Sequence, residues 1–171
     1  MHFRQALLSL VCLAISATSQ SAEIEVRTLG ASGGAAKARC ERCADGDYLV
    51  SSGRLEVVIG ASHRRDESFY KFPTADAFGS ILFYRPAGTD VRGDIMLGTP
   101  YVRVGNTTRH VRYERVEVQR SGTYVTFVAS AVYDGPEGSR AQFEGRYRFS
   151  GDSERVDATS HTSKCPFGLP S

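Results

Sequence analysis

Regular alternation of apolar and polar side chains between residues 109 and 162 is the feature that most constrains the fold of this chain. Three consecutive segments follow it clearly, RHVRYERVEVQ, TYVTFVASAVYD and SRAQFEGRYRFS, and a weaker fourth segment, ERVDATSHT, comes after them. In the third segment the small or apolar residues Ala141, Phe143, Gly145, Tyr147 and Phe149 alternate with Arg140, Gln142, Glu144, Arg146 and Arg148. Because successive side chains of a strand point to opposite faces, this pattern predicts a sheet with one face on a core and one charged face in water.

Shorter segments before residue 109 predict further strands. EIEVRTL (23–29) is typical of a short first strand. YLV (48–50) and RLEVVIG (54–60) predict a hairpin, because a short Ser-Gly turn separates two apolar runs. SILFY (80–84) and YVRV (101–104) each predict one more strand.

The apolar parity changes inside the segment RHVRYERVEVQ, from Val111 and Tyr113 to Val116 and Val118. One extra residue on a strand produces such a change, so we predict a β-bulge near residues 114–115. The chain after its N-terminal segment shows no convincing helical pattern. We therefore predict an all-β fold, an antiparallel β-sandwich of about eight strands.

The N-terminal residues predict an export signal. Arg4 precedes an apolar or weakly polar stretch from Ala6 to Ala17, and small residues continue to Ala22. The apolar part of a signal peptide has about 7–15 residues, whereas a membrane span needs about 20. We expect a cleaved signal peptide, a secreted or periplasmic protein, and no transmembrane segment.

The composition divides the chain into four regions. Residues 1–22 are the expected signal peptide, 23–44 a strand with a Gly/Ala-rich linker and a C-x-x-C motif, 45–162 the β-sandwich domain, and 163–171 an irregular tail. Because the strand pattern runs directly into that tail, an incomplete sandwich in a truncated or frameshifted product is an open alternative.

The charge balance gives no reason to expect nucleic acid as a partner. The chain has 21 basic and 19 acidic residues, a formal net charge of +2. A nucleic-acid-binding domain normally shows a strong basic excess on one face.

Three cysteines follow the expected signal peptide: Cys40, Cys43 and Cys165. Export to an oxidising compartment favours a disulfide, and the odd number leaves one thiol over. Pairing of Cys40 with Cys43 and pairing of either with Cys165 are both open.

No motif predicts catalysis, a metal or a cofactor. His63, His110 and His161 are isolated from one another in the sequence, while metal sites usually draw on short-spaced ligand pairs. No G-x-S-x-G motif is present. A small carbohydrate-active enzyme remains an alternative, with two carboxylates drawn from Asp90, Asp94, Glu114 and Glu144.

The segment from 61 to 79 breaks the strand pattern and predicts a long loop, a kind of segment that often carries function. Its cationic and aromatic side chains are the predicted ligand-binding residues, namely His63, Arg64, Arg65, Tyr70 and Lys71. Guanidinium groups pair with carboxylates or phosphates in a two-pronged fashion, which suits an acidic glycan. In the alternative interpretation, Phe69, Phe72 and Phe78 hold the loop on the sandwich and its charges face water.

Four segments resemble the N-terminal β-sandwich region of large secreted bacterial metallohydrolases of the polymerase-and-histidinol-phosphatase type. They are GDYLVSSGRLEVVIG (46–60), GSILFYRPAG (79–88), DIMLGTPYVRVGN (94–106) and SERVDATSHT (153–162). The last is also similar to a strand of carbohydrate-associated supersandwich domains. The resemblance implies an accessory domain without catalytic residues, because the metal-binding motifs of those proteins lie in a downstream domain. Lys164-Cys165-Pro166 departs from the pattern, where more sheet normally follows.

Taken together, the sequence predicts an exported, non-catalytic β-sandwich module that binds an acidic glycan or another cell-envelope component, or that has a structural role. The first alternative is a truncated accessory domain of a secreted metallohydrolase, and the second is a small glycan-active enzyme. If the last strand, 154–162, is an uncovered edge, self-association through it is also expected.

Overall fold

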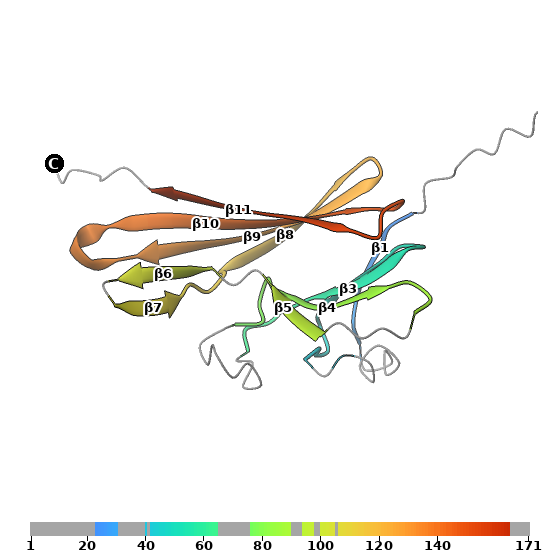
Figure 1. Ribbon diagram of the computed structural model, residues 1–171, viewed down its shortest axis with the longest axis horizontal. Helices are drawn as coiled ribbons and strands as arrows, with labels where there is room; N and C mark the ends of the chain where they lie inside the picture. Colours follow the sequence, from blue (N-terminus) through green and yellow to red (C-terminus); the bar gives the residue numbers. More distant parts are fainter. Residues whose placement is uncertain are drawn as a thin grey trace, which may run out of the picture.

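A computed structural model describes residues 23–30, 40, 42–64, 76–89, 94–97, 100–104 and 106–164 (Figure 1). This part of the chain contains strands, one short 3-10 turn and no α-helix, which confirms the all-β prediction. The elements are β1 (Glu25–Thr28), β2 (Tyr48–Ser51), β3 (Leu55–Ile59), β4 (Ile81–Pro86), β5 (Asp94–Leu97), β6 (Tyr101–Val104), β7 (Thr107–His110), β8 (Arg115–Ser121), β9 (Tyr124–Asp134), η1 (Pro136–Gly138), β10 (Arg140–Ser150) and β11 (Val156–Lys164). The predicted signal peptide and the C-terminal tail with Cys165 lie outside the described residues.

The strands form three antiparallel sheets. A five-stranded sheet has the order β1-β2-β3-β4-β5, and a four-stranded sheet has the order β11-β10-β9-β8. A separate hairpin, β6-β7, lies beside one end of β9 and β10 (Figure 1). The hairpin predicted from YLV and RLEVVIG is present as β2 and β3.

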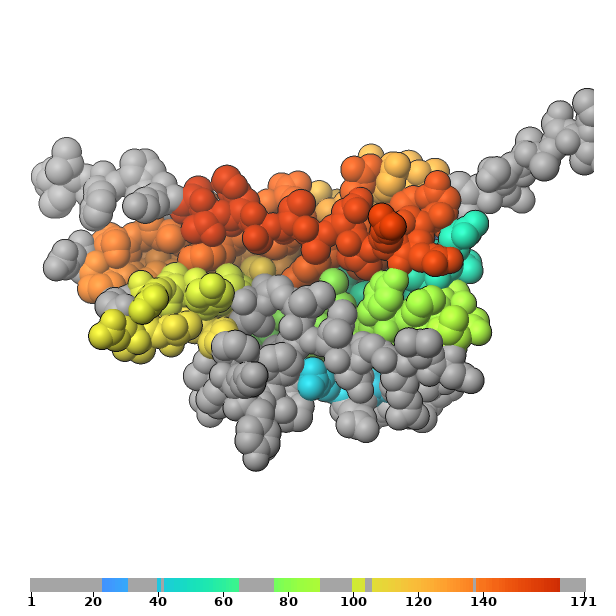
Figure 2. Space-filling model, in the orientation of Figure 1, coloured from blue at the N-terminus to red at the C-terminus, as the bar shows by residue number. Residues whose placement is uncertain are grey.

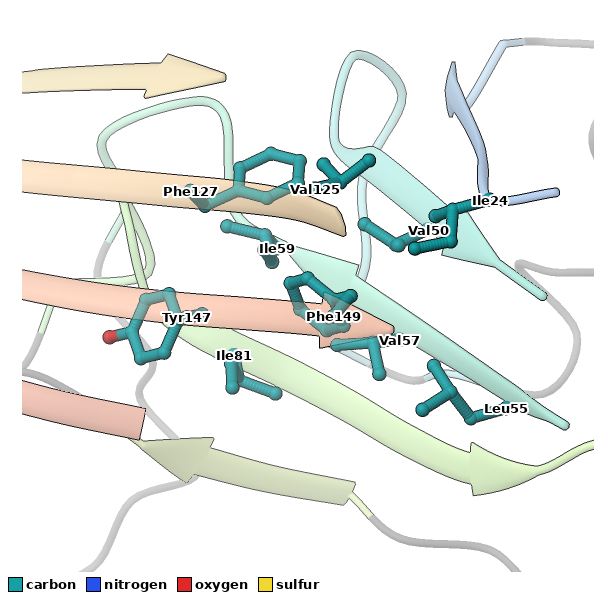
Figure 3. Close-up of a cluster of buried hydrophobic side chains, with 10 residues drawn as sticks. All are labelled: Ile24, Val50, Leu55, Val57, Ile59, Ile81, Val125, Phe127, Tyr147 and Phe149. Atoms are coloured by element: carbon teal, nitrogen blue, oxygen red, sulfur yellow. The ribbon is translucent and has the colours of Figure 1, made fainter. Parts of the chain in front are cut away.

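The main core lies between the two larger sheets (Figure 3). Its buried side chains are Ile24, Val50, Leu55, Val57, Ile59 and Ile81 on one side and Val125, Phe127, Tyr147 and Phe149 on the other. The rings of Phe127 and Phe149 meet edge to face with centroids 5.9 Å apart. Along β10 every second side chain is buried from Phe143 to Phe149, as the alternation predicted. Burial of each such large side chain contributes about 1.5–3 kcal/mol.

The predicted bulge near residues 114–115 is wrong. β7 ends at His110 and β8 begins at Arg115, and the two strands belong to different sheets. The parity changes because the chain passes from the small hairpin to the four-stranded sheet between them. This split, together with the short strand β5, for which no strand was predicted, gives eleven described strands where about eight were predicted.

Tyr113, in the connection between β7 and β8, joins the layers. Its side chain is buried, and it packs where Gly79 and Gly145 leave room. A Cβ atom on Gly79 would lie 2.9 Å from the Tyr113 ring and 3.0 Å from the Ala129 Cβ, and Gly79 has a positive φ of 71°. The hydroxyls of Tyr113 and Tyr147 share a hydrogen bond, and burial raises the pKa of both phenols.

Gly145→Ala should destabilise the fold, although alanine is normally better than glycine inside a strand. The new Cβ would overlap the Tyr113 hydroxyl, and overpacking of this kind costs about 1–3 kcal/mol. Denaturant unfolding of the variant measures the loss. Gly30→Ala is the matched control, because a Cβ at Gly30 meets nothing within 4 Å.

The double variant Gly145→Ala/Tyr113→Phe separates this contact from other effects. Removal of the hydroxyl relieves the overlap, so the double variant should lose less stability than the sum of the two single variants. Additive losses of stability would show that overlap with the Tyr113 hydroxyl is not what excludes a Cβ atom at residue 145.

Candidate functional site

The described ends of the predicted long loop lie against each other. We call residues 60–64 and 76–80 the loop base. Gly60 forms a parallel bridge with Phe78, and its N–H donates to the Ser80 carbonyl at 3.0 Å. The Ala77 N–H donates to the Arg64 carbonyl at 3.0 Å. A Cβ on Gly60 would overlap the Ala77 carbonyl, so this close approach of the two segments requires glycine.

A fully buried carboxylate, Asp47, holds one side of the loop base. Its Oδ1 accepts from the Ala61 N–H and from Arg64 at 2.9 Å each, and its Oδ2 accepts from the Ala44 N–H at 2.8 Å and from Arg64 at 2.5 Å. Asp47 is 0% exposed, and the Arg64 side chain is 24% exposed. A buried charge is tolerated when it is paired and its remaining lone pairs are satisfied, as they are here.

The guanidinium of Arg64 is therefore engaged in internal contacts. Besides Asp47, it donates to the Ser62 hydroxyl and to the Arg42 carbonyl at 2.9 Å each. The predicted ligand-binding residue Arg64 has at least four hydrogen bonds within the protein. Its role in the described structure is to fix the loop base.

The C-x-x-C motif is linked to the loop base through Arg64. Cys40 and Cys43 are at disulfide-bonding distance, with Cα atoms 5.4 Å apart. Both are buried among Leu29, Leu49 and Val58. Arg42 lies between the two cysteines, and its carbonyl accepts the hydrogen bond from Arg64 that makes this link. Cys165, the other predicted disulfide candidate, lies outside the described residues.

A second buried carboxylate, Asp76, organises the other side of the loop base. Its Oδ2 lies 3.3 Å from Nδ1 of His63 and 3.5 Å from Nε of Arg112. Its Oδ1 accepts from the Phe78 N–H at 2.9 Å. The Asp76 side chain is 4% exposed, but those of His63 and Arg112 are 51% and 54% exposed. The carboxylate thus anchors an imidazole and a guanidinium that are each about half exposed.

Phe78 fixes the orientation of the histidine. The rings of His63 and Phe78 have centroids 4.4 Å apart and an interplanar angle of 34°. Contact of Nδ1 with Asp76 leaves Nε2 as the ring nitrogen for a ligand. Contact with the Phe78 ring and with the Asp76 carboxylate therefore restricts the orientation of His63.

The structure combines one predicted residue with two that the sequence did not suggest. His63 lies beside Arg112, which comes from the β7–β8 connection far along the chain, and both contact Asp76. No spacing pattern links residues so distant, and Asp76 resembles any polar loop residue in the sequence. The predicted ligand-binding residues Arg65, Tyr70 and Lys71 lie outside the described residues.

The outer face of the four-stranded sheet has a separate polar hollow of about 330 Å³. Glu114, Arg115, Gln142, Glu144 and His161 are among the residues that line it. Glu144 also accepts a hydrogen bond from Nε of Arg146 at 2.6 Å. Two of the four carboxylates considered for glycan hydrolysis therefore lie around one hollow. Asp90 and the side chain of Asp94 lie outside the described part.

Comparison with protein-family models, curated proteins and solved structures finds no match to this chain. Among the described residues, no group of three or more His, Cys, Asp or Glu is placed to hold a metal ion. The described residues also include no helix with the length and apolar character to span a membrane.

Asp47→Ala should strongly destabilise the protein. The change leaves Arg64 and two backbone N–H groups without their acceptor, and removal of one partner of a buried ion pair costs about 3–5 kcal/mol. Denaturant unfolding measures the loss. Glu154→Ala is the control, because Glu154 forms an exposed pair with Arg54 at 3.8 Å, and such pairs contribute at most about 1 kcal/mol. Equal losses in the two variants would contradict the anchoring role of Asp47.

Proposed function

We propose that this chain is an exported, non-catalytic β-sandwich module that binds an acidic glycan at the loop base. One observation carries the proposal: His63 and Arg112 converge on the buried carboxylate of Asp76 while about half of each side chain stays exposed. The acidic glycan would belong to the cell envelope or its surroundings, in line with the predicted secreted or periplasmic location.

The chemistry of this pair suits a carboxylate on a sugar ring. Arg112 contacts Asp76 through Nε, and its side chain is 54% exposed. A guanidinium also carries two terminal nitrogens that can donate to a ligand. A guanidinium binds a carboxylate through parallel N–H groups, and an exposed imidazole exchanges hydrogen bonds with sugar hydroxyls or carboxylates. Phe78, which is partly exposed and whose ring contacts that of His63, adds an apolar group at the same place.

Preorganisation distinguishes His63 and Arg112 from ordinary surface side chains. A free surface arginine or lysine loses about 1.5–2 kcal/mol of side-chain entropy when a ligand fixes it. Asp76 and Phe78 already restrict His63, and Asp76 already restricts Arg112. A ligand bound here would therefore lose less free energy to ordering of the protein.

Two other functions remain proposals of lower rank. The first is a truncated accessory domain of a secreted metallohydrolase, which rests on the sequence resemblance of residues 46–60, 79–88, 94–106 and 153–162. Glycan hydrolysis is favoured by one observation, the shared hollow of Glu114 and Glu144. Neither alternative assigns a role to the orientation of His63 and Arg112.

Arg112→Gln and His63→Gln should each weaken binding of a polyuronate. Each change also removes one contact of the buried Asp76 carboxylate, so denaturant unfolding of both variants is measured beside binding. Loss of charge-assisted hydrogen bonds should raise the dissociation constant by about tenfold for Arg112→Gln. Calorimetric titration with an oligogalacturonate measures this, and a neutral oligosaccharide of the same length should not bind.

The matched control is Arg155→Gln, which removes the same charge from an exposed arginine next to β11. If this control weakens binding as much as Arg112→Gln, the interaction depends on general charge and the assigned site is wrong. Release of reducing ends from the glycan, lost in Glu144→Gln, would instead support the enzyme alternative.

A further inference from the structure

Strand β11 forms one edge of the four-stranded sheet and is exposed on both faces. It pairs with β10 in an unbroken register from Val156 opposite Phe149 to Lys164 opposite Ala141. All side chains from Asp157 to Thr162 are exposed, and none of the described strands pairs with the other side of β11. In the space-filling view β11, coloured red, lies at the surface along the upper side (Figure 2).

The other edges of the two larger sheets are protected in ways that β11 is not. β1 and β5 have four residues each. The edge strand β8 carries the charged residues Arg115, Glu117 and Arg120 along its length. Short or charged edges are the usual means by which sheets avoid pairing with another chain.

The sequence of β11, VDATSHTSK, differs from this pattern. Its ionised residues are Asp157 near one end and Lys164 at the other. Between them lie alanine, serine, threonine and one histidine, and no proline interrupts the strand. Hydroxyl side chains of this kind form favourable cross-strand pairs.

We propose that β11 pairs antiparallel with β11 of a second copy of this chain, so that the two four-stranded sheets become continuous. Antiparallel pairing brings the Asp157 end of one strand beside the Lys164 end of the other, whereas parallel pairing would place like charges together. The contact is the same on both copies, as two-fold symmetry requires.

An exposed tyrosine beside the edge supports this proposal. Tyr101 is 65% exposed, and it lines a groove of about 300 Å³ together with Ser160, His161 and Thr162 of β11. A strand added to β11 would project alternate side chains toward Tyr101. Pairing of two copies would therefore cover both the open backbone edge and this aromatic ring.

A charge-swap experiment tests the proposal. Ser160 lies in the middle of β11, so antiparallel pairing places the two Ser160 positions close together. Ser160→Lys and Ser160→Glu should each raise the dissociation constant of the dimer by about tenfold or more, because like charges then face each other. An equimolar mixture of the two variants should associate again.

Sedimentation velocity over a wide concentration range measures these states, with Gln119→Lys and Gln119→Glu on the opposite edge strand β8 as controls that should associate like the unmodified protein. Recovery in the mixture excludes misfolding as the cause, because misfolded chains would not regain specific association. A monomer at all concentrations, unchanged association in both Ser160 variants, or no recovery in the mixture would overturn the proposal. So would association that disappears in Cys165→Ser, which would indicate a disulfide-linked dimer.

Discussion

The buried carboxylate of Asp47 is the constraint on which the rest of the loop base depends. It accepts hydrogen bonds from the backbone at Ala44 and Ala61 and from both terminal nitrogens of Arg64. These contacts connect Asp47, just before β2, with Ala44, which follows the C-x-x-C motif, and with residues 61–64 after β3. An unpaired charge at this depth would be very costly, so the surrounding segments have one arrangement that satisfies it. The hydrogen bonds of Asp47 to Ala61 and Arg64 therefore position one side of the loop base.

Two buried carboxylates therefore have different roles a short distance apart in the sequence. Asp47 is enclosed by donors, and its partner Arg64 is mostly withdrawn from solvent. Asp76 is equally buried, but its partners His63 and Arg112 remain about half exposed. The first carboxylate is enclosed within the loop base, and we propose that the second orients His63 and Arg112 toward a ligand. Arg64 and Arg112 thus differ in exposure and in the number of their contacts, because each pairs with a different carboxylate.

The sequence predicted those parts of the structure that repeat along one strand. Alternation in residues 140–149 indicated which side chains of β10 are buried, and the Ser-Gly turn indicated the β2–β3 hairpin. It did not predict where the chain changes sheets, because the passage through Val111 and Tyr113 has the same local pattern as a bulge. It indicated His63 as a site residue but not Asp76 or Arg112, since their proximity arises from contacts between distant segments. Arg64 illustrates a further limit, because a sequence does not show whether a cation is engaged by a buried acid.

Side-chain NMR of isotope-labelled protein during titration with an oligogalacturonate tests the central claim most directly. We expect the resonances of the Arg112 guanidinium and the His63 imidazole to shift in a saturable way, and those of Arg64 to stay nearly unchanged, because its donors are already engaged by Asp47. A neutral oligosaccharide of equal length should cause no such shifts. Saturable shifts at Arg64 with none at Arg112 and His63, or shifts confined to other arginines, would contradict the assigned division between the two carboxylates.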